Sequence, residues 1–198
     1  ARERRKKVEA TQKTRLGTYS LFLTADTVVS FAVGLFGPFW VIYAQKFDRS
    51  MEAFGFAVGL KIFAFSLVAY YAGRLSDKTG RKVLMVAGRL ASALIVLAYT
   101  QIATLTQMYV LQVLFGIVGA IDATATAAFL GDITQKVSRG RDMGKFNAVT
   151  GSAGAMAMMM GGVAVGKFGI EIVFYAVAAL FCVSSLALLF MEENDGRG

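Results

Sequence analysis

Long apolar stretches alternate along this chain with short segments in which charged residues gather. A helix needs about 20 apolar residues to cross the ~30 Å hydrocarbon core of a membrane. Six stretches are of this order, at residues 18–45, 53–75, 83–99, 106–130, 143–165 and 171–191. The alternation of apolar and polar residues typical of transmembrane barrel strands is not found. The pattern therefore predicts an all-α membrane protein with six transmembrane helices.

The composition agrees with a membrane protein. The chain has 198 residues, of which 56% are hydrophobic and 17% charged, whereas soluble domains are roughly 45–50% apolar. A net charge of +8 would also suit a nucleic-acid partner. The basic residues, however, lie in short segments between apolar stretches, so membrane topology explains them better and we expect no nucleic acid.

The basic residues are distributed unevenly among the polar segments. They gather before the first span (Arg2, Arg4, Arg5, Lys6, Lys7, Lys13, Arg15), after the second (Arg74, Lys78, Arg81, Lys82) and after the fourth (Lys136, Arg139, Arg141, Lys145). Because basic loops stay in the cytoplasm, both termini are predicted to be cytoplasmic. We therefore expect a multi-pass protein of the cytoplasmic membrane, with a basic cytoplasmic segment at 1–17, a six-helix domain at 18–191 and a cytoplasmic tail at 192–198.

The residues available for chemistry are few. The chain has no histidine and a single cysteine, Cys182, which lies inside an apolar stretch. This inventory excludes a Cys/His metal site and a Ser-His-Asp triad. We therefore expect neither an enzyme nor a cofactor. If ions take part in the function at all, the proton is the one candidate.

A motif connects the second and third predicted spans. The segment GRLSDKTGRK, residues 73–82, resembles the signature G-x-L-[SA]-D-x-x-G-R-[KR] of the major facilitator superfamily. The stretch GDITQKVSRGRDMGKFNAVTG, residues 131–151, looks like the acid-then-RG connection that joins helices 4 and 5 in that family. Family members normally carry two six-helix halves in one chain, so the resemblance implies one major-facilitator-type half bundle.

The resemblance also implies a role for the motif as a conformational latch. Gly73 and Gly80 are expected to permit a tight turn, because glycine has no Cβ. Arg81 is expected to bridge to Asp132 at the end of the fourth span. Asp77 is expected near the amino terminus of a helix in a facing half, where free N–H groups favour an anion.

Two acidic residues lie inside the predicted spans, where charge is costly and is a functional candidate. Asp26 in the first span and Asp122 in the fourth lie at similar depth, and the resemblance implies that both helices line a central cavity. We expect the two acids to face that cavity and to bind a proton or a cationic substrate group. The alternative is that each acid only forms a hydrogen bond with a helix backbone or with a neighbouring hydroxyl, such as that of Thr24 or Thr126.

Other polar residues in the spans complete the predicted site. Lys61 could pair with Asp26 or meet an anionic substrate. Gln112 stands where the family's antiporter branch often has an arginine, and it is expected to face the cavity. Arg89, near the start of the third span, is expected to extend toward the cytoplasm. The predicted substrate and proton site thus comprises Asp26, Lys61, Gln112 and Asp122.

Small residues mark the second and fifth spans, at spacings that allow close helix approach. The residues concerned are Gly55, Gly59, Gly151, Gly154, Gly162 and Gly166. In the family these two helices face the other half, so a second six-helix half, most simply in a homodimer, is the expected partner besides the lipid bilayer and a small-molecule substrate.

Three functions fit this pattern. The first is a secondary transporter of small solutes that works by rocking-bundle alternating access. The second is a non-transporting interaction or scaffold protein, and the third is an excised half of a twelve-helix transporter. The charges inside the membrane favour transport over a scaffold, because a scaffold has no need of them.

Overall fold

The computed structural model describes residues 2–134 and 138–191, with side chains from Gly17 onward within those ranges. The predicted tail at 192–198 therefore lies outside the described residues. In the described part the regular secondary structure consists of α-helices joined by short connections. The helices are α1 (Arg2–Phe36), α2 (Trp40–Ala44), α3 (Met51–Thr79), α4 (Arg81–Tyr99), α5 (Leu105–Ile133), α6 (Arg139–Phe168) and α7 (Ile170–Leu189).

Six membrane-length spans are present among the described residues, as the sequence predicted. The first span combines most of α1 with α2, and the other five correspond to α3 to α7. Three helices extend beyond their predicted spans at both ends: α3 covers Met51–Thr79 rather than 53–75, α5 covers Leu105–Ile133 rather than 106–130, and α6 covers Arg139–Phe168 rather than 143–165.

The first span is not one continuous helix, contrary to the expectation for 18–45. α1 ends at Phe36 and α2 begins at Trp40, with a turn at residues 37–39 between them. Pro38, the one proline of the chain, lies in that turn. Proline lacks a backbone N–H, and its ring disfavours helical geometry in the residue before it, which explains the break. The helical backbone of α1 also continues through most of the predicted basic segment.

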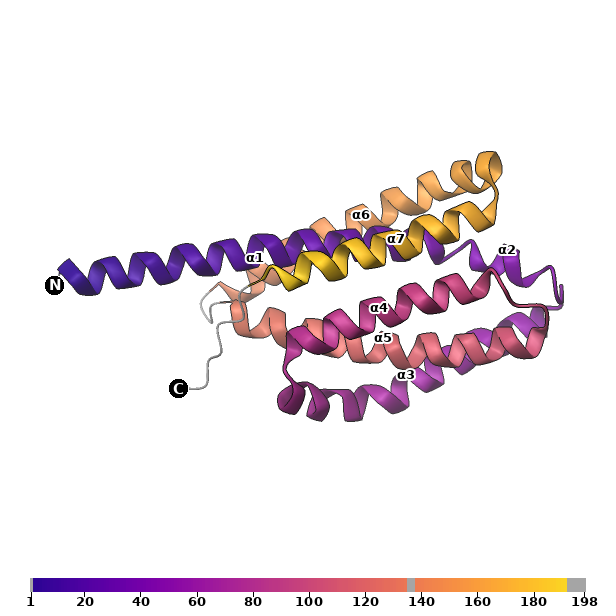
Figure 1. Cartoon of the computed structure of the whole chain (residues 1–198), viewed down its shortest axis with the longest axis horizontal. Coiled ribbons are helices and arrows are strands. Elements are labelled where there is room, and N and C mark those ends of the chain that lie inside the picture. The colour runs from indigo at the N-terminus through magenta and orange to yellow at the C-terminus, as the bar shows by residue number, and fades with distance from the viewer. Residues whose placement is uncertain (1, 135–137, 192–198) are drawn as a thin grey trace.

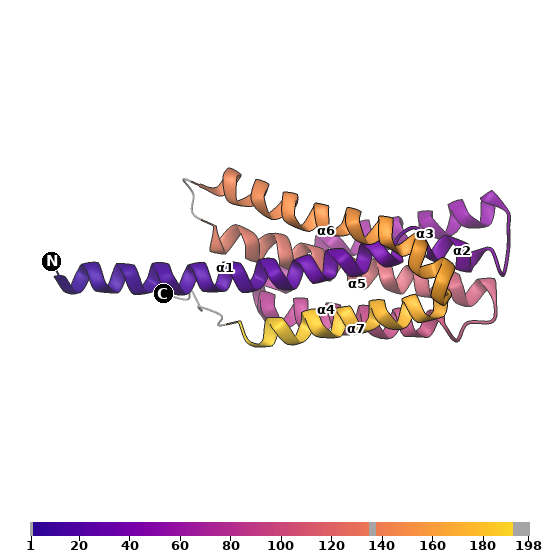
Figure 2. The same cartoon turned by 90° about the horizontal axis from the view of Figure 1, so that it is seen from above.

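The helices run side by side along one common direction (Figures 1 and 2). α3 packs along α5, α1 packs along α6 and α7, and α4 lies between α5 and α7, whereas α1 and α5 touch only slightly. In Figure 1 the start of α4 lies at the same end of the bundle as the start of α1, and α2 lies at the opposite end. We name these the Arg81 end and the Trp40 end.

Two apolar clusters of buried side chains fill the bundle. In the cluster toward the Trp40 end, the ring of Phe36 lies 5.5 Å from that of Tyr99 and 5.3 Å from that of Phe115. In the cluster toward the Arg81 end, the ring of Phe22 lies 4.9 Å from that of Phe129. Aromatic pairs at these separations stabilise a core beyond their buried area.

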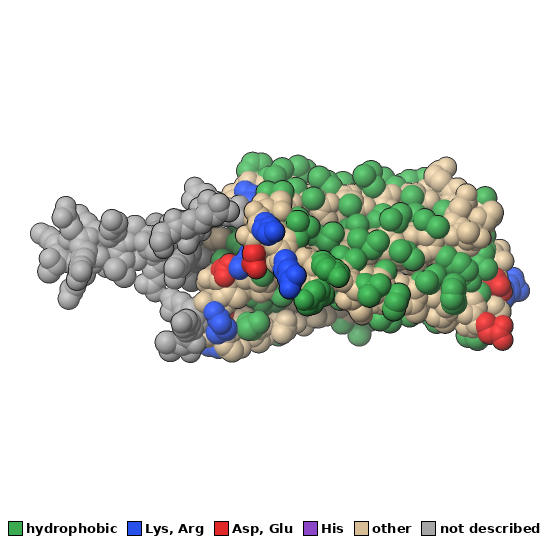
Figure 3. Space-filling model, turned by 90° about the horizontal axis from the view of Figure 1, so that it is seen from below, with side chains coloured by type: hydrophobic (Ala, Val, Ile, Leu, Met, Phe, Trp, Pro, Cys, Tyr) green, Lys and Arg blue, Asp and Glu red, His purple; other side chains and the backbone are tan. Residues whose placement is uncertain are grey.

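The outer surface is apolar over its middle and charged toward its two ends, as Figure 3 shows for one face. Of the six spans, α3 and α6 are the least buried. Large apolar side chains stand out from both helices, with Phe63 of α3 64% exposed and Met159 of α6 78% exposed. Such surfaces fit lipid or another helical bundle rather than water.

Candidate functional site

A buried arginine occupies the centre of the bundle. Arg89 of α4 is completely buried, and each of its nitrogens has a partner on another helix. Nη2 lies 2.5 Å from Oδ1 of Asp26 on α1, and Nε lies 3.3 Å from Oδ1 of Asp122 on α5. Nη1 donates to Oγ of Ser184 on α7 at 2.6 Å. One side chain therefore ties four helices together, and we call these four residues the Arg89 cluster.

Two neighbouring features hold the Arg89 cluster in place. The hydroxyl of Ser184 donates to the carbonyl oxygen of Ala25 at 2.8 Å, which bridges α7 and α1. On α4, a Cβ added to Gly88 would lie 3.1 Å from the Cβ of Asp122. The absence of that Cβ allows α4 and α5 to approach closely enough for the carboxylate to reach the guanidinium.

The charges in the Arg89 cluster do not cancel. With both carboxylates ionised, two negative charges face one positive charge, and a single added proton would make the cluster neutral. Burying an ion pair is costly, and the cost is offset only when the charged groups find several well-placed hydrogen bonds. The guanidinium uses three nitrogens in this way, which offsets the cost of burying the cluster.

The position of Arg89 corrects the prediction that its side chain extends toward the cytoplasm. Met85, Arg89, Ser92 and Val96 are all buried, and their spacing of i, i+4, i+7 and i+11 puts them on one face of α4. Arg89 therefore points into the bundle, where the two acids offset its desolvation. This spacing is the signal in the sequence that could have identified it.

The two predicted acids are brought together, but through Arg89. Their side chains are 12% exposed at Asp26 and 18% exposed at Asp122, and both are packed between helices. Both acids bind Arg89 rather than the backbone or hydroxyl partners of the alternative prediction, and their use by a substrate stays a prediction. Within the described residues, no group of three or more His, Cys, Asp or Glu side chains gathers as a metal site.

Lys61 and Gln112 lie apart from the Arg89 cluster. The predicted pairing of Lys61 with Asp26 is wrong, because Asp26 bonds to Arg89 instead. The ammonium of Lys61 lies 5.2 Å from the ring centroid of Phe115 on α5. Gln112, also on α5, is 1% exposed, and its Nε2 has no hydrogen-bond acceptor within the described part of the chain.

The predicted contact between Arg81 and Asp132 is confirmed, since Nη1 of Arg81 forms an ion pair with Oδ2 of Asp132. The same nitrogen donates to the carbonyl oxygen of Ala128 at 2.5 Å, so the start of α4 is fastened to the end of α5. Nη2 of Arg81 lies 3.8 Å from Oδ1 of Asp77, one helical turn away. The contact of Asp77 with a facing half stays a prediction.

The two glycines of the motif differ in their roles. Gly80 ends α3 and precedes α4 with a φ of +96°, a conformation that favours glycine. Gly73, in contrast, lies inside α3, which continues to Thr79. The prediction that Gly73 takes part in the turn is therefore wrong, because the helix extends four residues past the predicted end at residue 75.

The predicted small-residue interface divides into two groups. A Cβ added at four of the glycines would meet no atom within 4 Å, namely Gly55, Gly59, Gly151 and Gly166. Such a Cβ at Gly162 would make only an ordinary contact, 3.9 Å from the ring of Phe39. Gly154 instead packs against α1 of the same half, where its Cβ would lie 3.2 Å from the carbonyl oxygen of Ser30. Five of the six positions thus keep an accessible surface.

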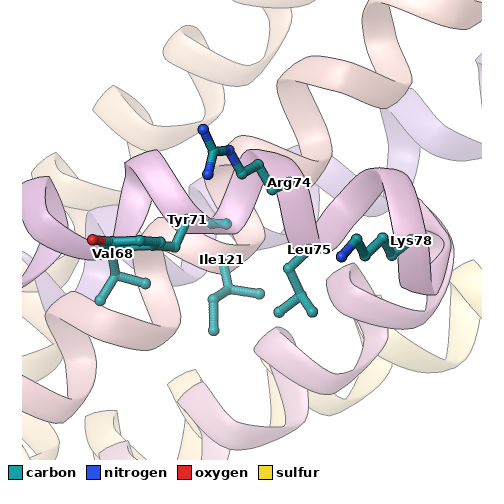
Figure 4. A pocket seen from close by; sticks show the side chains of 7 residues that line it. Val68, Tyr71, Arg74, Leu75, Lys78 and Ile121 are labelled. Carbon is teal, nitrogen blue, oxygen red and sulfur yellow. The ribbon is translucent and has the colours of Figure 1, made fainter.

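An open groove lies along α3 near its end at Thr79, away from the predicted interface glycines Gly55 and Gly59 (Figure 4). Its volume is about 330 Å³, and Val68, Leu75 and Ile121 point to the same side of it. Arg74 points the other way and donates from Nη2 to the hydroxyl of Tyr70 at 3.0 Å. The groove is therefore mostly apolar, and none of the predicted substrate residues lines it.

Six membrane-length helices around a buried charge cluster, with a charged turn between the second and third spans, define a multi-pass membrane protein. The chain belongs to the Major Facilitator Superfamily, whose sequence pattern it matches over residues 22–198. The resemblance carried by the two motifs is thereby confirmed, and the protein is an integral membrane protein.

Similar proteins include transporters and resistance proteins of bacteria. The MFS-type transporter YitZ of Bacillus subtilis is 28% identical over 159 residues, which are 80% of this chain and 97% of YitZ. The multidrug resistance protein MdtG of Proteus mirabilis is 26% identical over 79% of this chain and 40% of its own length. The class H tetracycline resistance protein of Pasteurella multocida is 28% identical over 89% of this chain and 45% of its own length. The chain thus spans about half the length of the two resistance proteins.

Proposed function

We propose that this chain is one half of a secondary active transporter that works by alternating access and is coupled to protons through the Arg89 cluster. The observation that carries the proposal is the completely buried guanidinium that binds two carboxylates and a hydroxyl on three other helices. Charged groups in a membrane are costly and usually functional.

The Arg89 cluster could link a proton to a movement of helices. When one carboxylate takes up a proton, it loses its charge and most of its attraction to Arg89. Asp122 and Asp26 lie on α5 and α1, whose backbones make few close approaches, and Arg89 supplies a polar connection between them besides the aromatic contacts of Phe22 and Phe36. Protonation would therefore loosen the tie between these helices, as a coupled change of conformation requires.

The contacts of Arg81 would control access at the predicted cytoplasmic end. Arg81 fastens the start of α4 to the end of α5 through Asp132 and Ala128, and Asp77 lies within reach of the same guanidinium. If Asp77 also contacts a facing half, its removal would favour opening at this end. Asp77→Ala should then increase the labelling of a cysteine introduced there, and unchanged labelling would count against the latch.

The substrates we propose are small drug-like solutes. Two relatives carry multidrug resistance and tetracycline resistance in their names. Their similarity to this chain covers less than half of their own length, so the substrate class rests on the family and on the part of each protein that matches.

A second six-helix half would complete the transport path. In the superfamily the two halves are parallel repeats related by an axis along the membrane normal. Two copies of a six-span chain can take this arrangement without inverting either copy, and a twofold dimer is the commonest symmetric assembly. The accessible glycines of α3 and α6 offer surfaces for such pairing, and the half-size relative YitZ gives it further support.

Transport by the purified chain in lipid vesicles tests the proposal. We expect tetracycline or a cationic dye to move against its gradient when a pH gradient is imposed, and to stop when the gradient is dissipated. Asp26→Asn and Asp122→Asn should each abolish this coupling while leaving the protein folded. Glu171→Gln, which changes an exposed acid paired with Lys46, is the matched control and should retain transport. Transport that ignores the pH gradient, or coupling that survives both substitutions, would refute proton coupling by this cluster.

A further inference from the structure

Among the residues that the structure describes, no acid pairs with Lys61, a cation inside a membrane span. Lys61 lies between the ends of α3, at Met51 and Thr79. Among the described residues its ammonium has one polar or aromatic contact, the face of Phe115 at 5.2 Å from the ring centroid. A charge at this depth is costly, and a contact with an aromatic face offsets only part of the cost. Within the described residues, the ammonium of Lys61 therefore lacks a hydrogen-bond acceptor.

The side of α3 that carries Lys61 turns toward the other helices rather than toward lipid. Phe54, Val58 and Lys61 are spaced at i, i+4 and i+7, so they lie on one stripe. Phe54 and Val58 pack against the apolar cluster at the Trp40 end, and the ring of Phe54 lies 5.6 Å from that of Trp40. Lys61 is consequently half-buried at the inner side of the seam between α3 and α5.

The backbone at Lys61 is held firmly against α5. A Cβ added at Gly116 would overlap the carbonyl oxygen of Lys61, so glycine is what allows the two helices to approach here. Gly119 lies near Phe65 further along the same seam, which shows that α3 and α5 run in the same direction. The two helices lie side by side in Figures 1 and 2.

A second donor without an acceptor lies on the same seam. Gln112 precedes Gly116 by one helical turn, so both residues occupy the same face of α5. The Nε2 of Gln112 is buried and has no hydrogen-bond partner. A long side chain on a helix extends toward the amino terminus of its helix, which carries the ammonium of Lys61 from the level of Gly116 toward that of Gln112. Two unused donors thus belong to the same seam between α3 and α5, and the ammonium of Lys61 lies over the ring of Phe115.

We propose that Lys61 and Gln112 form a subsite for the carboxylate of an organic anion, whose apolar body lies against Phe115. A planar carboxylate offers two oxygens, one for the ammonium and one for the amide N–H. This inference rests on the proposed transport function and names the chemistry of one part of the substrate. The subsite lies outside the Arg89 cluster, in which both acids are already bound to Arg89.

A second copy of this chain does not offer a ready counter-ion for Lys61. Within the described spans, the acids away from the helix ends are Asp26 and Asp122, and both are already bound to Arg89. The remaining described acids, such as Asp77 and Glu171, lie near the ends of helices. In a dimer of copies, a substrate is therefore the simplest source of the missing negative charge.

Three probes of matched shape test the subsite: 1-naphthoate, 1-naphthylmethanol and 1-naphthylmethylammonium. Binding to the full chain in nanodiscs of neutral lipid is measured by titration calorimetry. A charged hydrogen bond should make naphthoate bind at least ~10-fold more tightly than the alcohol. Lys61→Gln should remove this preference, Lys61→Arg should keep it, and Gln112→Leu should weaken naphthoate binding a few-fold. Lys46→Gln, at the exposed end of the bundle, is the control and should change nothing.

Several results would overturn the subsite. Equal binding of the three probes would do so, as would a naphthoate preference that survives Lys61→Gln. A Lys61→Gln variant that dissociates a dimer, without any carboxylate preference in the parent protein, would assign the lysine to an acid of the second half instead. The titration needs no pH gradient, so a protein that prefers naphthoate and shows no coupled transport would refute the proposed function and leave the subsite intact.

Discussion

The guanidinium of Arg89 takes three protein partners in place of water. Asp26 is held at 2.5 Å and Asp122 at 3.3 Å, so the two carboxylates are bound unequally by the same cation. Removing the cation would leave two buried negative charges close together, whereas removing all three charges would leave neutral groups of similar size. The stability of the bundle therefore depends on the balance of these charges more than on any one of them.

Replacing Arg89 alone should be strongly destabilising. We expect Arg89→Met to lower the free energy of unfolding by about 3–5 kcal/mol, because it leaves buried carboxylates without a counter-ion. Adding Asp26→Asn and Asp122→Asn to this variant should recover most of the loss. Denaturant unfolding in detergent micelles measures both effects. A triple variant less stable than Arg89→Met would show that the charges are not coupled in this way.

At the scale of helices, close approach along one seam fixes the pair α3 and α5. At Gly116 a Cβ would overlap the backbone of Lys61, whereas one turn later a Cβ at Gly119 would lie 3.8 Å from the ring of Phe65. Glycine is thus required at one of these two positions of α5 and not at the other. Gly116 is needed for contact between the helices, and Gly119 is not.

The two glycines give a matched pair of substitutions. Gly116→Ala should push α3 away from α5 and cost about 1–3 kcal/mol through overpacking. Gly119→Ala should leave stability unchanged or raise it by up to ~1 kcal/mol, since alanine favours a helix. Thermal unfolding of the two variants in the same detergent compares them directly. Equal effects would mean that the seam can relax at Gly116.

The connection between α3 and α4 gives a further test. Gly80 has a φ of +96°, which a residue with a Cβ adopts only with strain. Gly80→Ala should therefore cost roughly 1–2 kcal/mol of stability. Gly131→Ala in α5, where a Cβ would meet no atom within 4 Å, is the control and should be neutral or stabilising. The comparison fails if both variants unfold at the same temperature.

The sequence predicted these elements unevenly, for physical reasons. The six spans follow from length and hydropathy alone, and the contact of Arg81 with Asp132 follows from a motif with fixed spacing. The break at Pro38 was missed because hydropathy does not register a missing N–H. The partners of Arg89 are 33 to 95 residues away in the chain, so no local pattern could identify them.

As a whole molecule, the six-helix half has an inner side and outer surfaces that it does not cover itself. α3 and α6 are the least buried spans, and most of their predicted interface glycines have free space around them. These surfaces would lie against lipid in a monomer and against a second half in a dimer. The small residues favour the second arrangement, because they allow helices to approach closely.

Cysteine crosslinking tests the dimer of halves. In a Cys182→Ser background, cysteines at Gly59 and Gly162 should trap covalent dimers in native membranes under mild oxidation. Cysteines at Leu94 and Val183, which are exposed on α4 and α7, are the control pair and should give little product. Equal yields from both pairs, or a monomer that transports without a second half, would contradict the arrangement.

Synthesis imposes an order on the parts of the Arg89 cluster. Asp26 is made 63 residues before Arg89, which at about 5–20 residues per second is roughly 3 to 13 s. Until Arg89 has been made, the carboxylate of Asp26 has no neutralising partner from α4. An unpaired carboxylate resists full burial in lipid, so the first helix cannot reach its final depth until α4 follows. We therefore expect a delay in translation between the two helices to lower the yield of correctly folded protein.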